Sequence, residues 1–516
     1  MEFNYSRHNL SKNESRVERF FEIIPGALSW SIIIGACAFS FIKPLATALV
    51  MIMFLLYWVL RLIYMNIFLV LSYMRLAKEK DTDWMKRIEA VDAVPAPLKS
   101  KDVYHLVIVT VMKETKDIVE PCLVAIKNGT YPSKRILAVI ALESRSEENV
   151  KKDMAALQVK YKNYFFDLLI AVHPAGLPDE AAVKGANATC AAKKAAEYFQ
   201  ARNIPYENVI VSCFDADTVS RPDYFCCLTY YFMITPERAK ASFQPIPVYY
   251  NNIWEVPSFA RIIDIGTSFF ELVEATNPSK LVTFSSHSMS FKALVDIGYW
   301  PVNLISDDSA IFWKAFIHYD GNYQTVPIYT TVSMDIAEGR NALETFVSIY
   351  KQKRRWAWGV ENFPIVLRAF LKSKSISLYK RINFSYKLLD SFVSWATWSF
   401  LLAFLSWLPA IFAGREFATS TVYYIAPRIR GTVFSLAFVG ILICMVISLL
   451  LLPAKSAKNR AWKTVTHIFE WLSIPVVVLL LSALPALDAQ TRLMSGRYME
   501  FWVTDKRRNK GIVPRD

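Results

Sequence analysis

The chain has little charge for its length, and its cysteines form no recognisable pattern. Charged residues make up 20% of the 516 residues, whereas soluble domains carry about 25%. The seven cysteines show no C-x-x-C or other zinc-binding spacing, so we interpret them as reduced and mostly buried. With only 15 glycines and 54% hydrophobic residues, the composition also excludes collagen, a small disulfide-rich scaffold and an intrinsically disordered chain.

Hydrophobic residues are concentrated in long runs near the two ends of the chain: 23–42, 45–74, 388–413, 432–453 and 468–487. A helix rises about 1.5 Å per residue, so about 20 apolar residues cross the hydrocarbon core of a bilayer. The first run is not a cleaved signal peptide, because the second follows almost at once without a small-residue cleavage site between them. We predict an integral, multi-pass protein of the inner or plasma membrane.

The net charge of +14 indicates on which side of the membrane each part lies. Seven Lys and Arg residues fall in 75–101 and four in 374–387. Because cytoplasmic loops carry an excess of Lys and Arg, these segments predict that everything between them is cytoplasmic. Beside long apolar runs, the basic excess favours membrane lipids as partners, and we expect no nucleic acid.

The C-terminal end fits this rule less simply. The loop 455–463 and the tail 506–510 are both basic, yet only the run 468–487 separates them. Either that run is re-entrant, bent at Pro475 and Pro485, or the tail lies outside against the charge rule. We favour the re-entrant segment.

The middle of the chain alternates short β-branched runs with helical patterns. We expect strands at 105–111, 136–142, 165–172 and 207–214, and helices at 117–128, 146–162 and 185–202. Strands that alternate with helices predict an α/β domain with a mostly parallel sheet. Such a sheet binds its ligand at the carboxyl ends of the strands, so the loops after these strands are the expected site.

Two acidic residues, Asp215 and Asp217, follow the fourth expected strand in the sequence FDAD. Carboxylates two residues apart at a strand end can hold one divalent cation, whose other ligands are phosphate oxygens and water. The alternative is an Asp-rich turn that caps the next helix. Taken alone, the motif leaves both interpretations open.

Two further motifs also have a structural alternative. Ser306, Asp307 and Asp308 precede an apolar helix, where they could cap it or supply a general base. The segment 352–356 (QKRRW) lies on a helical stretch just before a hydrophobic run. Its basic residues could grip lipid headgroups, or they could clamp a diphosphate leaving group while the Trp forms a wall for a sugar.

These motifs in this order resemble the membrane-embedded family-2 glycosyltransferases, the group that contains cellulose, hyaluronan and chitin synthases. The family pattern is an early acid, then DxD, an acidic pair and QxxRW. The resemblance covers about residues 103–360 and the flanking runs. The matching segments are TVMKE (110–114), Glu143, KGAN (184–187), Asp215 and Asp217, Asp308, and Gln352, Arg355 and Trp356.

Three departures from the family pattern concern the donor and the acceptor. Glu143 stands where the family usually has Asp, and Lys113 where it has Asn. The segment 284–289 (FSSHSM) lacks the Gly-rich acceptor loop of typical members.

The resemblance implies a cytoplasmic, GT-A-like, nucleotide-sugar-binding domain inserted between N- and C-terminal transmembrane helices. The expected parts are a cytoplasmic N-terminal segment (1–22), two transmembrane helices (23–74), a basic juxtamembrane linker (75–102), the catalytic domain (103–335), amphipathic interface helices with QxxRW (336–387), a C-terminal transmembrane region (388–487) and a basic interfacial tail (488–516).

The resemblance also implies roles for individual residues in an inverting, metal-dependent sugar transfer. Asp217, with Asp215, would hold Mg²⁺ or Mn²⁺, and Asp308 would be the base. Arg355, Gln352 and Trp356 complete the expected catalytic group, and the expected donor-binding residues are Glu143, Lys184, Asp215 and Glu114. The donor would be a UDP-sugar or, less typically, GDP-mannose, and the acceptor a growing glycan that is exported as it is made, with an accessory export or regulatory subunit.

Two alternatives differ in the acceptor or in the class of protein. One is a single addition to a lipid-linked acceptor such as polyprenyl phosphate. The other is a transporter with a nucleotide-binding regulatory domain, although the chain has no GxxxxGK[ST] motif and no obvious inverted repeat.

Overall fold

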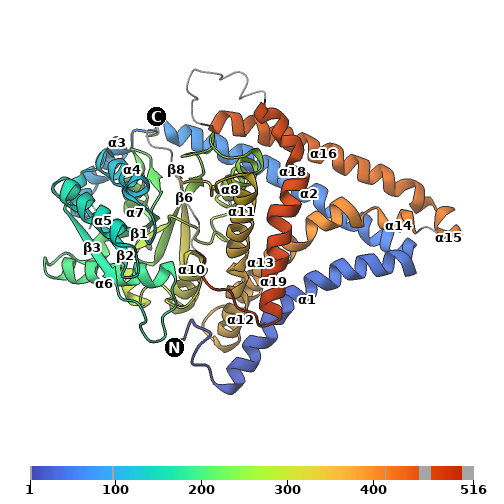
Figure 1. Cartoon of the computed structure of the whole chain (residues 1–516), viewed down its shortest axis with the longest axis horizontal. Helices are drawn as coiled ribbons and strands as arrows, with labels where there is room; N and C mark the ends of the chain where they lie inside the picture. The colour runs from blue at the N-terminus through green and yellow to red at the C-terminus, as the bar shows by residue number, and fades with distance from the viewer. Residues whose placement is uncertain (1–2, 96–97, 413, 453–465, 503–516) are drawn as a thin grey trace.

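The computed structural model describes residues 3–95, 98–412, 414–452 and 466–502, and it contains one eight-stranded sheet (Figure 1). The strand order is β3-β2-β1-β4-β7-β6-β8-β5. The strands are β1 (Tyr104–Val111), β2 (Ile136–Glu143), β3 (Asp167–His173), β4 (Val209–Asp215), β5 (Val219–Ser220), β6 (Ala241–Val248), β7 (Ser288–Ser290) and β8 (Gln324–Ser333).

The first half of the sheet is parallel and is connected by helices. Strands β1 to β4 pair in parallel, and between them lie α4 (Lys116–Lys127), α5 (Glu148–Tyr161) and α6 (Lys184–Gln200). The apolar runs of β1, β2 and β4 are buried on both faces, as is typical of strands covered by helices on each side. In β1, Leu106 packs towards α6, whereas Val107 packs towards α4 and α5. The predicted α/β class with a mostly parallel sheet is confirmed.

The second half of the sheet is mixed. β7 is antiparallel to both β4 and β6, and β6 and β8 pair in parallel. The other helices around the sheet are α3 (Trp84–Ala93), α7 (Tyr224–Ile234), α8 (Ser258–Glu274), α9 (Phe291–Asp296), α10 (Asp307–His318), α11 (Ala342–Ala357) and α12 (Asn362–Lys372). This arrangement brings the ends of β4 and β8 and the start of α10 towards one edge of the sheet.

Among the described residues, five helical runs are long and apolar enough to cross a membrane: Lys12–Ile42 (α1), Pro44–Lys80 (α2), Leu378–Ile411, Thr421–Leu451 (α16) and Thr466–Met494. The third contains α13 (Leu378–Phe400), a π-helical turn (Leu401–Leu405) and α14 (Leu408–Ile411), and α15 (Arg415–Ala418) follows it. α2 packs along α16. These helices extend beyond the apolar runs, because polar residues continue the same turns.

The run Thr466–Met494 differs from the expected bent segment. It includes α18 (Ile474–Val478), a π-helical turn (Leu479–Ala483) and α19 (Leu484–Met494). Pro475 and Pro485 lie in the first turn of α18 and of α19, where proline is tolerated, so neither reverses the chain. Figure 1 shows α18 and α19 running between the α/β domain and the outer parts of α1, α2 and α16.

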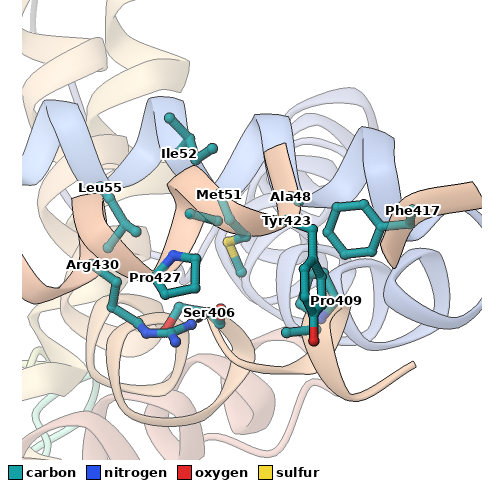
Figure 2. A pocket seen from close by; sticks show the side chains of 12 residues that line it. Ala48, Met51, Ile52, Leu55, Ser406, Pro409, Phe417, Tyr423, Pro427 and Arg430 are labelled. Atoms are coloured by element: carbon teal, nitrogen blue, oxygen red, sulfur yellow. Dashed lines mark hydrogen bonds between the residues drawn. The ribbon is translucent and has the colours of Figure 1, made fainter. Parts of the chain in front are cut away.

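A small cavity of about 20 Å³ lies between α2, α14 and α16, away from the sheet (Figure 2). Met51 and Leu55 line it together with Pro427 and Arg430. The Arg430 guanidinium lies 3.5 Å from the centroid of the Trp407 ring and donates to the Ser406 carbonyl oxygen at 3.1 Å. These contacts compensate one charged group inside an apolar helix bundle.

Candidate active site

Three side chains from separate segments meet at the carboxyl end of β4. Asp215 is the last residue of β4, Lys184 begins α6, and Asp308 lies in the first turn of α10. Lys184 Nζ is 3.0 Å from Asp215 Oδ1 and 3.0 Å from Asp308 Oδ1. The first acid of DxD and the expected base therefore share one cation.

Lys184 is positioned to carry a positive charge in this cluster. Its side chain is 11% exposed, whereas those of Asp215 and Asp308 are 28% exposed. Burial alone would lower the pKa of the Lys184 ammonium, but the two carboxylates raise it well above its ordinary value. The group stays charged at neutral pH and can face an anionic ligand.

The two acids of the 307–308 pair have different environments. Asp307 is buried, and its Oδ2 is enclosed and has no hydrogen-bond partner within the described part of the chain. Burial, with help from the Asp308 charge, raises the pKa of Asp307 to about 8. The Asp308 side chain is 28% exposed, and the buried imidazole of His287 has Nδ1 3.8 Å from its Oδ1. Of the two, Asp308 is the carboxylate that a substrate can reach.

The raised pKa of Asp307 predicts a specific effect on stability. From the usual value of 3.8 up to about 8, the folded protein holds a proton that the unfolded chain has released. The Asp307 contribution to the free energy of unfolding therefore falls as the pH rises through this window and is constant above it. We expect Asp307→Asn to remove that fall. In thermal melts, the Tm of the variant minus the Tm of the wild type should therefore increase from pH 5 to pH 8. A pH-independent difference in Tm would contradict this assignment.

Asp217 is more deeply enclosed than Asp215. It is 1% exposed, and its Oδ2 accepts a hydrogen bond from the backbone N–H of Asp335 at 2.8 Å. Asn251 Nδ2 donates to the Asp217 carbonyl oxygen at 2.9 Å. These bonds fix the loop after β4 against the end of β8.

The donor set at this loop fits a divalent cation bound together with a diphosphate. Among the described residues there is no group of three or more His, Cys, Asp or Glu residues arranged to hold a metal ion. Mg²⁺, however, is typically bound through one or two carboxylates, with water and substrate phosphates as the other ligands. Asp215 and Asp217 supply two carboxylates two residues apart, which meets that requirement.

The QKRRW segment lies on α11, and its side chains point in different directions. Burial lowers the pKa of the Arg355 guanidinium, and the charges of the nearby acids, Asp215 first among them, partly oppose that shift. Arg355 Nη1 also donates to the Trp502 carbonyl oxygen at 3.2 Å. The next residue towards the N-terminus, Arg354, instead pairs with Asp488 on α19 at 2.8 Å.

The other two residues of this motif, Gln352 and Trp356, also belong to α11. Trp356 is partly exposed and lies against Tyr249, with ring centroids 6.0 Å apart, and against Phe284 at 5.7 Å. Gln352 is buried, and its Oε1 has no hydrogen-bond partner among the described residues. Phe284 immediately precedes Ser285, so the Trp356 ring lies close to the acid cluster.

The two remaining acids lie in loops after the first strands. Glu143 ends β2, where its carboxylate is 3.2 Å from Arg145 Nε and 3.4 Å from His173 Nδ1. Glu114 Oε2 accepts the backbone N–H groups of Met112 at 2.8 Å and Lys113 at 3.0 Å. Glu143 thus stands apart from the Lys184 cluster, on the side of β3.

The structure adds site residues that the motifs did not indicate. Ser285 Oγ donates to Asp215 Oδ2 at 2.7 Å, and Thr283 Oγ1 donates to the Asp308 carbonyl oxygen at 2.6 Å. Both belong to the segment around 284–289 in which the expected Gly-rich loop is missing. A run of hydroxyl residues before a short strand was the available signal, because hydroxyls commonly orient carboxylates.

Comparisons with known proteins identify the family of the chain. Residues 210–486, more than half of the chain, match the family described as glycosyl transferase family group 2. Two curated relatives, both named poly-beta-1,6-N-acetyl-D-glucosamine synthase and both from Staphylococcus epidermidis, are 29% identical over 178 residues. The match covers 33% of this chain and 39% of each relative, so it spans about two fifths of their length.

Solved structures show a more distant likeness. The mannosyltransferase PcManGT from Pyrobaculum calidifontis, in complex with GDP-Man and Mn²⁺, is 14% identical with a TM-score of 0.39, covering 81% of this chain and 97% of that one. S. aureus TarS 1-349 in complex with UDP-GlcNAc is 13% identical with a TM-score of 0.32, covering 64% and 89%. The α/β fold follows from the strand order of the sheet.

Proposed function

Because this chain belongs to glycosyl transferase family group 2, we propose that it moves a sugar from a nucleoside-diphosphate donor to a growing glycan with inversion at the anomeric carbon. The observation that carries the proposal is the meeting of Asp215, Lys184 and Asp308 at the carboxyl end of β4. A cation between two acids at this edge suits a ligand with both a charged diphosphate and a neutral sugar.

Asp308 acts as the general base in this proposal. Its carboxylate takes the proton of the acceptor hydroxyl while that oxygen bonds to the anomeric carbon of the donor sugar. The bond between that carbon and the diphosphate oxygen breaks, and its electron pair leaves with the diphosphate. Attack opposite to the leaving group inverts the configuration.

The leaving diphosphate is stabilised by fixed positive charges. Lys184 and Arg355 both lie among the acids of the cleft and can turn towards phosphate oxygens. Asp215 and Asp217 would hold Mg²⁺ or Mn²⁺, which would supply Lewis-acid stabilisation of the leaving group. Glu143 and Glu114 would contact the nucleoside end of the donor, whereas Trp356 and Gln352 would bind the acceptor end.

Removal of the metal should stop turnover. We expect EDTA to abolish sugar transfer and excess Mn²⁺ or Mg²⁺ to restore it, and Asp217→Ala to remain inactive at any metal concentration. Asp223→Ala is the matched control, because Asp223 pairs with Arg221 outside the cleft at 3.0 Å. Full activity of purified Asp217→Ala would contradict the metal assignment.

The donor and the acceptor are proposed by chemistry. A UDP-sugar is the preferred donor and GDP-mannose the alternative, since the match to a poly-N-acetylglucosamine synthase favours a polymer of amino sugars. We propose repeated addition coupled to export, for which an accessory export or regulatory subunit would be the partner. The alternative is one addition to a lipid-linked acceptor such as polyprenyl phosphate, and the product length on a gel separates the two.

We also propose that the α/β domain is cytoplasmic in a multi-pass protein of the inner or plasma membrane. The N-terminal residues Tyr5 and Arg7 contact α12 and its preceding turn, so the N-terminus lies on the same side as the domain. The run Thr466–Met494 contacts helices beside the sheet near both of its ends: Glu470 pairs with Arg261 in α8 at 2.5 Å, and Asp488 pairs with Arg354 in α11 at 2.8 Å. We therefore infer that this run lies along the domain without crossing the bilayer.

The experiment for the proposed function is a screen of radiolabelled donors with membranes that contain the protein. UDP-N-acetylglucosamine, UDP-glucose and GDP-mannose are each supplied, and any labelled polymer is digested with glycosidases of known linkage specificity. We expect one donor to label a membrane-associated glycan. A nucleotide-regulated transporter would label none, and neither would a catalytically inert membrane protein.

A further inference from the structure

The first residues of the chain lie against the segment that carries the proposed base. The N-terminal strap, defined here as residues 4–8, contacts α12 and the turn that precedes it. Tyr5 and Ser6 in the strap are buried. Arg368 on α12 holds the strap in place, because its Nη2 donates to the carbonyl oxygens of Ser6 at 2.8 Å and Asn4 at 3.2 Å.

One arm of this contact runs through Glu361, which is completely buried. Its Oε1 accepts hydrogen bonds from the backbone N–H groups of Ile305 at 3.0 Å and Ser306 at 2.9 Å, and from Ser306 Oγ at 2.7 Å. Its Oε2 accepts from Arg7 Nη2 at 2.5 Å and from Trp358 Nε1 at 2.9 Å. A buried carboxylate needs a charged partner, and Arg7 in the strap is that partner.

The second arm runs through the next residue, Asn362. Tyr5 Oη donates to Asn362 Oδ1 at 2.7 Å. The amide nitrogen of Asn362 lies 3.0 Å from Ser306 Oγ and 3.1 Å from Ser309 Oγ. Both arms therefore begin in the strap and end at Ser306.

Ser306 stands at the start of α10, the helix that carries the proposed base Asp308. It is the N-cap of α10, and Asp307 and Asp308 are the first two residues of that helix. A serine N-cap usually accepts a backbone N–H of its own helix. Ser306 makes no such bond, because its hydroxyl is held by Glu361 and Asn362 instead. The direction of the first turn of α10 is thus set from outside the helix.

We propose that the N-terminal strap, through the Arg7–Glu361 and Tyr5–Asn362 contacts, fixes the position of the Asp308 carboxylate beside Lys184 and Asp215. The inference rests on the proposed function, in which Asp308 is the base. Glu361 and Asn362 are buried, and both bond Ser306, so they would act on Asp308 through the start of α10. A shift of about 1 Å in a catalytic group can cost about 10²-fold in rate, which sets the scale of the expected effect.

The test compares strap variants with matched controls in the full-length purified protein. We expect Arg7→Ala to lower kcat for sugar transfer by about 10²-fold without changing the Kd for the nucleoside diphosphate. Arg7→Lys should recover part of kcat, since it restores a charge for Glu361. Tyr5→Phe removes one hydroxyl and keeps the ring, so it should fold and show a smaller loss of kcat. Arg16→Ala, an exposed residue of α1, is the control for loss of a positive charge.

Combining substitutions separates positioning from general stability. If the strap acts through the base, Arg7→Ala adds no further loss of kcat to Asp308→Asn. A full additional loss in that background overturns the inference, as does wild-type kcat in both Arg7→Ala and Tyr5→Phe. Parallel loss of nucleotide binding in every strap variant also overturns it. Wild-type kcat in Asp308→Asn would overturn the proposed function instead, so the two failures are distinguishable.

Discussion

We expect Asp308→Asn to lower the kcat of the proposed sugar transfer by about 10²- to 10⁴-fold, the usual contribution of a general base. The amide has nearly the same shape as the carboxylate but cannot take the proton of the acceptor hydroxyl. Nucleotide binding should change little, because Asp215 and Lys184 remain in contact at 3.0 Å. Transfer is measured with labelled donor, and binding of the nucleoside diphosphate by calorimetry.

The neighbouring acid provides the control for this variant. Burial and the Asp308 charge raise the pKa of Asp307, which favours its neutral form, so Asp307→Asn is a conservative change in charge and size. We expect Asp307→Asn to keep most of its activity at pH 7. If the loss were instead confined to Asp307→Asn, the roles of the two acids would have to be exchanged. Loss of nucleotide binding in Asp308→Asn would make that residue a structural cap.

Arg355→Ala should lower kcat by about 10²- to 10³-fold, the typical cost of removing one donor that stabilises developing charge. The charges of Asp215, Asp307 and Asp308 act on Arg355, so in the proposed reaction its guanidinium would stabilise the departing diphosphate. Arg354→Ala is a closely matched control, since it removes the same charge from the adjacent position of α11. Arg354 is paired with Asp488 in a partly exposed ion pair, and such pairs contribute little.

The comparison is made in detergent, where a lipid-anchoring role has no effect. Equal activity in the two arginine variants would favour the lipid-headgroup interpretation of the QKRRW segment. A loss in Arg355→Ala that greatly exceeds the loss in Arg354→Ala supports the clamp. We expect the second result, because the charges of Asp215, Asp307 and Asp308 act on Arg355, whereas Arg354 pairs with Asp488 on α19.

The first four strands were predictable from the sequence because their signal is local. Each is a short β-branched run followed by a helical pattern, and the strands lie at Tyr104–Val111, Ile136–Glu143, Asp167–His173 and Val209–Asp215. The position of Asp215 at a strand end followed directly from this pattern. Family resemblance added the order of the motifs, which local periodicity does not contain.

Strands β6 and β8 were not predicted, and proline explains why. β6 contains Pro245 and Pro247, and β8 contains Pro327. Proline removes a ladder donor and argues against a central strand. In the structure β6 and β8 pair in parallel with an irregularity between Gln244 and Ile246, which accommodates this sequence.

Contacts between residues far apart in the chain could not be predicted from the sequence either. The bonds of Tyr5 and Arg7 to α12 and its preceding turn join residues more than 350 positions apart. The different environments of Asp307 and Asp308 could not be read from two identical residues in succession. They arise because neighbouring positions on a helix point about 100° apart, so one faces the core and the other the cleft.

The predicted tail 488–516 is only partly visible in the structure. Its first residues continue α19 to Met494, and Phe501 lies with its ring 4.9 Å from the Arg355 guanidinium. Residues 503–516 and the basic loop 455–463 lie outside the described residues.

The most direct test of the central claim is to measure, in one reaction of the purified protein, the nucleoside diphosphate released and the labelled sugar found in glycan. The account predicts equal amounts of the two products for the wild type with its preferred donor, and neither product for Asp308→Asn above a small residual rate. The contradictory result is binding of a nucleotide sugar at this cleft with no release of nucleoside diphosphate and no labelled glycan from any of the three donors.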